Sequence, residues 1–153
     1  MVNINVWGPI YWRLIHVIVF ALPDDVVVSE KLEIVSILKS ICVNIPCPTC
    51  QEHATAFMNR IRWALVRNKW DFLKLLNDFH NSVNKRLKKK SFTLEESISS
   101  ISQLDTKVVC KDFVIISSKR PQGMSLFGMQ SKQSNSVTRI CAFIKKYRSH
   151  YKV

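Results

Sequence analysis

Hydrophobic residues recur at every third or fourth position through most of the first hundred residues, which is the spacing of one buried face of an α-helix. The pattern predicts helices over residues 8–22, 29–45, 47–61, 70–87 and 93–104. The second helix shows it most plainly, because its apolar stripe is formed by Leu32, Val35, Leu38, Ile41 and Cys42. Four long helices and a short fifth, joined by short connections, predict an all-α bundle.

Capping signals place the ends of these helices. Pro9 suits the first turn of the first helix, and Cys47 and Pro48 suit the cap and the first position of the third. Thr93 and Glu96 have the spacing of a capping box at the start of the fifth.

The pattern changes in the last third of the chain. Val108–Val109 and Phe113–Ile116 predict a short strand pair or one extended segment. The Ser-, Gln- and Gly-rich residues 117–136 predict a mobile stretch, and residues 136–148 predict a basic amphipathic helix.

The net charge of +12 is concentrated at the same end. Residues 111–153 hold nine lysines and arginines against one acidic residue, whereas residues 1–110 hold 14 against ten. We therefore predict a folded domain over residues 1–107 and a basic, partly disordered extension over residues 108–153. The extension could contact an acidic partner or an anionic membrane, or be a solvated basic tail, and nucleic-acid binding is not predicted.

Composition favours a single helical domain. Apolar residues make up 47% of the 153 residues, and only three glycines and five prolines are present. The apolar stretch Leu14–Leu22 follows no basic cluster and is too short to span a bilayer. We therefore expect a soluble protein without a signal peptide or a transmembrane segment.

Cys47 and Cys50 are the strongest chemical signal in the chain. Two cysteines three positions apart at a helix start are typical of a redox pair or of half a metal site, because the helix N-terminus lowers a thiol pKa. Zinc is the sharpest alternative, since Cys42 and His53 would complete a set of four ligands. A thioredoxin-like arrangement is disfavoured because no strand precedes the pair, and a buried inert pair is the remaining alternative.

Two further pairs of polar and aromatic residues share a helix face. Trp12 and His16 are four positions apart, as are His80 and Asn84, which a basic run follows. Each pair alone fits an ordinary protein core or a cation-rich helix end.

Together, the ordered motifs W-G-x-x-x-W-x-x-x-H, C-P-x-C and H-N-x-V-N-x-R resemble the Erv/ALR family of FAD-linked sulfhydryl oxidases, especially the small versions of large DNA viruses. The resemblance covers about residues 6–105. It implies a four-helix bundle plus a short fifth helix, with FAD in the bundle mouth. It also implies an enzyme that forms disulfides in dithiol client proteins and passes the electrons to oxygen, giving hydrogen peroxide.

The resemblance implies the cofactor contacts as well, and no metal. Gly8, Trp12 and His16 would line the flavin, while Lys90 and Phe92 hold weaker positions near the adenine or pyrophosphate. The fourth helix would contact adenine, ribose and phosphates through His80, Asn81, Val83, Asn84 and Arg86.

By the same resemblance, Cys50 is the flavin-proximal thiolate and Cys47 is the thiol that exchanges with the client. Several family features are missing. No shuttle pair precedes Cys47, where only Cys42 could serve. Leu94 stands where many members have a structural cysteine, and Leu75 where many have tryptophan.

Cys110 and Cys141 have no family counterpart, and they could act as a shuttle, pair with each other or be idle. The resemblance further implies a homodimer packed through the first two helices, and a place in the host cytoplasm and in virions if the viral likeness holds. The non-enzymatic alternatives are a zinc-binding module and a non-catalytic assembly scaffold.

Overall fold

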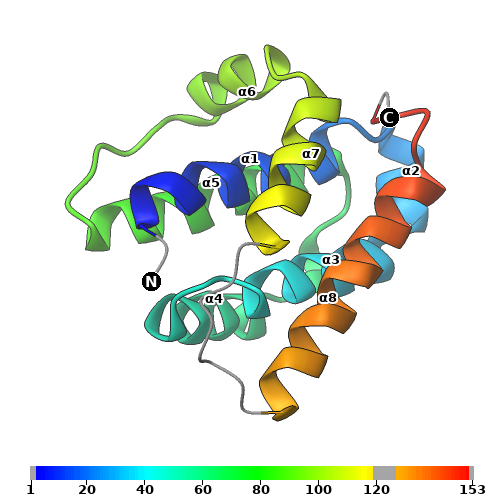
Figure 1. Ribbon diagram of the computed structural model, residues 1–153. Coiled ribbons are helices and arrows are strands. Elements are labelled where there is room, and N and C mark those ends of the chain that lie inside the picture. Colours follow the sequence, from blue (N-terminus) through cyan, green and yellow to red (C-terminus); the bar gives the residue numbers. More distant parts are fainter. Residues whose placement is uncertain (1–2, 119–126, 152–153) are drawn as a thin grey trace.

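The computed structural model describes residues 3–118 and 127–151, with the side chains of residues 127–134 excepted. Within these residues every regular element is a helix, which confirms the all-α class (Figure 1). The helices are α1 (Ile4–Phe20), α2 (Asp24–Ser29), α3 (Lys31–Val43), α4 (Pro48–Arg60), α5 (Lys69–Arg86), α6 (Leu94–Ser102), α7 (Thr106–Ser118) and α8 (Phe127–Lys146), with a 3₁₀ turn at Trp63–Leu65.

Helix α1 begins earlier than predicted. The side chain of Asn3 accepts a hydrogen bond from the backbone N–H of Asn5 and caps the helix, so Pro9 lies in the helix interior. The predicted start at Gly8 and Pro9 was therefore wrong. Trp7 lies within the added turns and packs into the core on the same face as Tyr11, whereas Pro9 lies on the opposite, exposed face.

The second predicted helix is divided in two. Helix α2 ends at Ser29, and α3 begins after Glu30 without a side-chain cap. Leu32 was wrongly assigned to the buried stripe, because its side chain is 79% exposed. The other four residues of the predicted stripe, Val35, Leu38, Ile41 and Cys42, are buried as predicted, and Ile34 and Ile37 join them.

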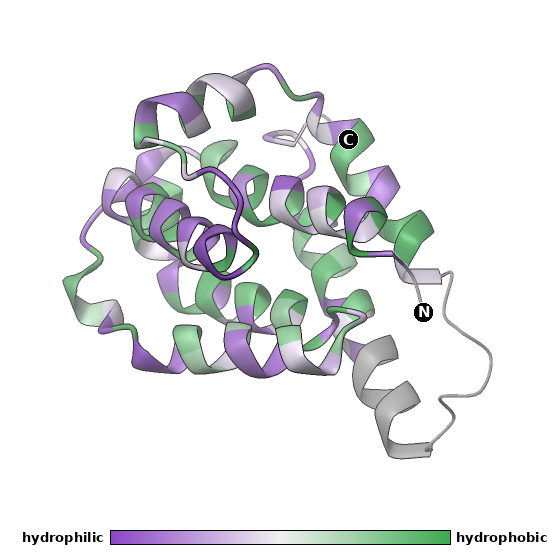
Figure 2. Ribbon diagram, turned by 90° about the vertical axis from the view of Figure 1, so that its left-hand side faces the viewer, coloured by the Kyte–Doolittle hydropathy of each residue, from purple (hydrophilic) through white to green (hydrophobic). Residues whose placement is uncertain are grey.

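Helix α1 lies at the centre of the packing. It contacts α3, α5, α6 and α7, while α3 also packs against α4 and α8 (Figure 1). Each helix carries both hydrophobic and hydrophilic stretches, as expected when one face is buried (Figure 2).

The predicted strands near residues 108–116 are wrong, because this segment belongs to α7. Val109, Cys110, Phe113 and Ser117 are its buried residues, and their spacing of three to four positions follows one helix face. Of the stretch predicted to be mobile, residues 119–126 lie outside the described part, and residues 127–136 are helical. The predicted basic helix lies largely within α8.

The two C-terminal helices share the core of the preceding helices. Phe113 of α7, Phe143 of α8 and Tyr151 are fully buried in the same hydrophobic cluster as α1 and α3. Arg139 donates hydrogen bonds to Ser36 and Ser40, and α8 ends with an ion pair to the same helix. Helices α7 and α8, the described helices of the basic extension, are therefore packed against α1 and α3 respectively.

Candidate active site

A cavity of about 750 Å³ lies among α1, α4, α5 and α6. Its size is in the range of protein sites for small molecules and cofactors. The residues that line it come from positions 4–16, 45–54, 79–92 and 96–104, so four separate parts of the chain build it.

Helix α1 brings Gly8, Trp12 and His16 to the cavity, because positions four apart share a helix face. Gly8 is buried, yet a Cβ added there would meet only the Cγ1 atom of Ile4, at 3.7 Å. The space beside the Gly8 backbone therefore belongs to the cavity and not to a neighbouring helix.

Aromatic rings line the cavity between α1 and α5. Trp12 stacks on His80 with ring centroids 4.0 Å apart and an angle of 10° between the planes. Phe79 meets the Trp12 ring edge-on at 4.9 Å. Such flat, apolar faces are suited to the rings of a flavin or an adenine.

The two histidines share a hydrogen bond. His16 Nε2 lies 3.3 Å from His80 Nδ1. Burial, with a smaller effect of His80, lowers the pKa of His16 to about 3. Burial and then Lys89 lower the pKa of His80 to about 4. Both imidazoles are therefore neutral at pH 7, so one ring nitrogen donates the hydrogen bond and the other accepts it.

Asn84 supplies a buried polar group without a protein partner. Its side chain lines the cavity and is 5% exposed, and its Nδ2 has no hydrogen-bond partner within the described residues. Buried amide groups are rarely left unpaired, because the desolvation costs about 1–3 kcal/mol. A ligand acceptor in the cavity would satisfy this donor.

Basic side chains line the cavity at the C-terminal end of α5. The helix ends in a Schellman motif, in which Lys89 N–H bonds to Asn84 O and Lys88 N–H to Lys85 O, with Lys88 at φ 55°. This turn places Lys89 at the cavity beside Arg86. The two side chains give the cavity a positive charge suited to a pyrophosphate.

Two predicted contact residues lie elsewhere. Asn81 does not line the cavity, because its amide holds the α5–α6 connection through two hydrogen bonds with the backbone of Phe92, at 2.7 and 2.9 Å. Lys90 is exposed and also does not line the cavity, while its neighbour Lys89 does. The other predicted contacts, Gly8, Trp12, His16, His80, Val83, Asn84 and Arg86, all line it.

Polar contacts also join α5 to α6 near Leu94, where no cysteine is present. Asn77 donates to the Phe92 carbonyl and accepts a hydrogen bond from Ser97. The predicted capping box is present, with Thr93 and Glu96 each accepting from the other's backbone N–H. Sequence reasoning missed Ser97 as a cavity residue, because a serine on a short helix gave no signal of its own.

The dithiol pair lies at the start of α4, as predicted. Cys47 is the N-cap, its Sγ accepts a hydrogen bond from the Cys50 backbone N–H at 3.3 Å, and Pro48 is the first helical residue. The two cysteines form a disulfide and are both half-buried. Cys50 lines the cavity, and Cys47 does not.

The predicted zinc alternative is wrong. Cys42 is buried on α3, where burial raises the pKa of its thiol to about 12. Within the described residues, no group of three or more histidine, cysteine or acidic side chains could hold a metal ion. Cys47 and Cys50 are bonded to each other, so their sulfurs are not free thiolates.

The remaining thiols, Cys110 and Cys141, are free in this structure. Burial, with a smaller effect of Cys141, raises the pKa of Cys110 to about 11, and burial also raises that of Cys141. Burial thus disfavours the thiolate form of both residues, more strongly for the buried Cys110 than for the half-buried Cys141.

Comparison with known proteins assigns the family. Residues 9–103 match the model of the Erv1 / Alr family, which is more than half of the chain. The chain therefore belongs to the Erv1 / Alr family. The match ends before α7, so the two C-terminal helices lie outside it.

Several viral proteins are similar to the chain. A FAD-linked sulfhydryl oxidase of African swine fever virus (isolate Tick/Malawi/Lil 20-1/1983) is 33% identical over 90 residues, covering 59% of this chain and 75% of that protein. A putative FAD-linked sulfhydryl oxidase of Invertebrate iridescent virus 6 is 32% identical over 103 residues, covering 62% and 89%. One of Frog virus 3 is 36% identical over 80 residues, covering 52% and 53%. No solved structure matches the chain significantly.

None of the described helices combines the length and the apolar character that crossing a bilayer requires.

Proposed function

We propose that the chain is a FAD-linked sulfhydryl oxidase in which Cys47 exchanges with the client and Cys50 faces the cofactor. Membership of the Erv1 / Alr family and the viral relatives support the activity and the cofactor. One observation supports these separate roles for the two cysteines. Of the two residues of the disulfide, only Cys50 lines the cavity.

The cavity has the chemistry that FAD requires. The orphaned Asn84 amide offers a hydrogen bond, the Gly8 backbone leaves room, and Arg86 and Lys89 offer positive charge. Trp12 and His80 offer aromatic faces. When bound, FAD supplies a two-electron acceptor that is reoxidised by oxygen, giving hydrogen peroxide.

The chain's own residues carry the thiol chemistry. A client thiolate attacks Cys47 Sγ, the Cys47–Cys50 bond breaks, and Cys50 leaves as a thiolate in the first turn of α4. Backbone N–H groups and the helix dipole stabilise that charge. A second client thiolate then attacks the client sulfur of the mixed disulfide and releases Cys47, so two client thiols become one disulfide.

We further propose that α1, α3, α4 and α5 form the four-helix unit and that α6 is the short fifth helix. The cofactor would bind at the open end of this four-helix unit. Among the described residues, none after Leu104 lines the cavity, which supports assigning FAD binding to residues 1–107 and a structural role to the described part of residues 108–153. The resemblance also supports a homodimer. Since α7 and α8 cover α1 and α3, its interface would use other surfaces. The viral relatives favour a place in the host cytoplasm or in virions.

Visible spectroscopy and oxygen uptake test the proposal. The purified protein is expected to show flavin absorption and to consume oxygen with dithiothreitol. Cys47→Ser and Cys50→Ser should each abolish turnover, whereas Cys141→Ser, the matched control, should retain it. Turnover in either of the first two variants contradicts the mechanism. Bound FAD without oxygen uptake would support an assembly scaffold.

A further inference from the structure

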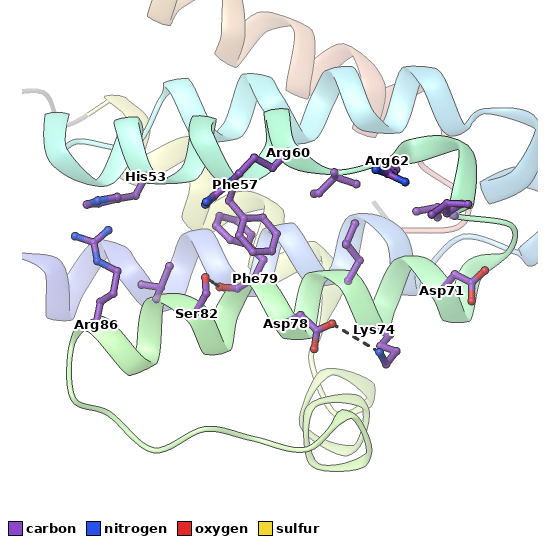
Figure 3. A pocket seen from close by; sticks show the side chains of 15 residues that line it. His53, Phe57, Arg60, Arg62, Asp71, Lys74, Asp78, Phe79, Ser82 and Arg86 are labelled. Carbon is purple, nitrogen blue, oxygen red and sulfur yellow. Dashed lines mark hydrogen bonds and ion pairs between the residues drawn. The ribbon is translucent and has the colours of Figure 1, made fainter.

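A second hollow, of about 800 Å³, runs between α4 and α5. We call it the α4–α5 groove. Side chains from both helices point into it, and its rim is exposed to solvent (Figure 3). At one end it shares four residues with the FAD cavity: His53, Phe79, Val83 and Arg86.

The floor of the groove is aromatic and apolar. The rings of Phe57 and Phe79 stack with centroids 4.7 Å apart and an angle of 26° between the planes. Ile61, Val66 and Leu75 extend this floor away from the shared end. A surface of this kind binds the apolar side chains of a partner.

The rim of the groove carries unbalanced positive charge. Among the described residues, no carboxylate lies within ion-pair distance of Arg60, Arg62 or Arg86. The two acidic residues of the rim are already paired: Asp71 with Arg67 at 3.2 Å, and Asp78 with Lys74 at 3.8 Å. Because Arg86 also lines the cofactor cavity, Arg60 and Arg62 are the two arginines that remain for a groove ligand, and their planar guanidinium groups are suited to carboxylates.

Neither cysteine lines the groove, but one end of it lies near Cys50 along α4. His53 lies on α4 three residues after Cys50, about one helical turn away. Counting about 1.5 Å per helical residue from Cys47, Phe57 lies about 15 Å along the axis and Arg60 about 20 Å. An extended peptide covers these distances in about four to six residues.

We propose that the α4–α5 groove docks the polypeptide segment of an acidic client and presents its thiol to Cys47. An apolar client side chain packs on Phe57, and carboxylates bind Arg60 and Arg62. This inference rests on the proposed function and specifies its substrate class. A thiol-bearing polypeptide suits these features, because the groove combines an apolar floor and an arginine rim with an end about one helical turn from Cys50.

Synthetic dithiol peptides provide the test with the FAD-loaded full chain. The acidic peptide carries Cys-x-x-Cys, an apolar residue four or five positions away, and two glutamates just beyond it. Two comparison peptides have the same sequence except that glutamine or lysine replaces both glutamates. At low salt, kcat/KM for the acidic peptide is expected to exceed that for the glutamine peptide by about tenfold, and high salt should reduce the difference.

Charge reversal at the rim should abolish this preference. Arg60→Glu with Arg62→Glu is expected to lower kcat/KM for the acidic peptide by about tenfold or more. Turnover of dithiothreitol and the flavin spectrum should be unchanged. The matched control is Lys39→Glu with Lys111→Glu, which makes the same charge change at exposed positions of α3 and α7.

Four results would overturn the proposal. The first is equal kcat/KM for the acidic and glutamine peptides, and the second is an equal effect of the control variant. The third is a loss of dithiothreitol turnover or flavin in the arginine variant, which would place these arginines in the cofactor site. The fourth is a loss of self-association in that variant by sedimentation, which would assign the groove to a second copy of the chain.

A binding measurement separates this proposal from the proposed function. Fluorescence anisotropy of the acidic peptide with both cysteines changed to serine requires no turnover. Tighter binding than the glutamine peptide, weakened in the Arg60 and Arg62 variant, supports the groove even if the chain fails to oxidise dithiothreitol. Tighter binding of a single-stranded oligonucleotide of equal charge would overturn the assignment to an acidic polypeptide.

Discussion

Tyr151 anchors the C-terminal end of the chain to the first helix. Its ring is fully buried, and its hydroxyl donates a hydrogen bond of 2.8 Å to the carbonyl of Ile18. That carbonyl lies in the last turn of α1, where a helix leaves carbonyls without helical donors. The Thr106 hydroxyl at the start of α7 donates in turn to the carbonyl of Tyr151.

Changing Tyr151 to phenylalanine removes one oxygen and leaves the buried Ile18 carbonyl unpaired. The expected loss of unfolding free energy is about 1–2 kcal/mol, or roughly 2–8 °C in Tm for a chain of this size. Tyr147→Phe is the matched control, because the buried hydroxyl of Tyr147 makes no hydrogen bond of normal geometry among the described residues, although Lys146 and Glu30 lie near it. That change is expected to leave stability unaltered or slightly higher. Tyr151→Ala should cost about 3–5 kcal/mol through the cavity it creates.

Urea unfolding followed by circular dichroism at 222 nm measures these differences, at one fixed concentration of protein and of FAD. Equal midpoints for Tyr151→Phe and Tyr147→Phe would refute the reasoning, since the tail would then not be part of the cooperative core. A Tyr151→Ala variant with the stability of the unmodified chain would refute it as well.

Three other predictions concern protonation and the backbone. The pKa of His16 is about 3 in the folded chain against 6.5 ordinarily, so the unfolded state binds its proton first as the pH falls. Unfolding free energy should therefore decrease below pH 6.5 by up to about 1.4 kcal/mol per pH unit from this residue, levelling near pH 3. Urea titrations between pH 7 and 4 should show a smaller decrease for His16→Gln. Iodoacetamide at pH 8 should modify Cys42 and Cys110 slowly in the native reduced protein, because burial raises the pKa of both thiols. Mass spectrometry measures the modification, and rapid modification of either cysteine would contradict this prediction. Lys88→Gly should stabilise the protein by about 0.5–1 kcal/mol, since Lys88 adopts a positive φ. An unchanged or lower Tm would argue against strain at this turn.

Local sequence signals determined several features around the candidate active site. Cys47 as a cap with Pro48 after it, and the Thr93 capping box, depend on neighbours along the chain and could be predicted from spacing alone. The pairing of Trp12 with His16 on one face follows from helix periodicity in the same way.

Contacts between distant residues could not be predicted. Asn81 was expected at the cofactor, but it bonds to the backbone of Phe92, because the α5–α6 connection folds back onto α5. Lys89 reaches the cavity in place of Lys90 because a positive φ at Lys88 turns the chain. Because residues 88–90 are all lysines, the sequence does not indicate which of them adopts the positive φ or which side chain then faces the cavity.

The sequence by itself thus determined the class of fold through helix periodicity, and its ordered motifs pointed, through the family resemblance, to the Cys47–Cys50 pair and to most of the residues that line the cavity. The family resemblance also predicted that Cys50, and not Cys47, lies at the cavity, as the structure has it. Only the tertiary structure showed an arginine-rimmed groove between α4 and α5. The tertiary structure also determined the secondary structure of residues 108–116, whose apolar residues are compatible with a strand but lie in helix α7. The reason is burial: Phe113 and Tyr151 gain their stability from α1 and other helices far away in the sequence.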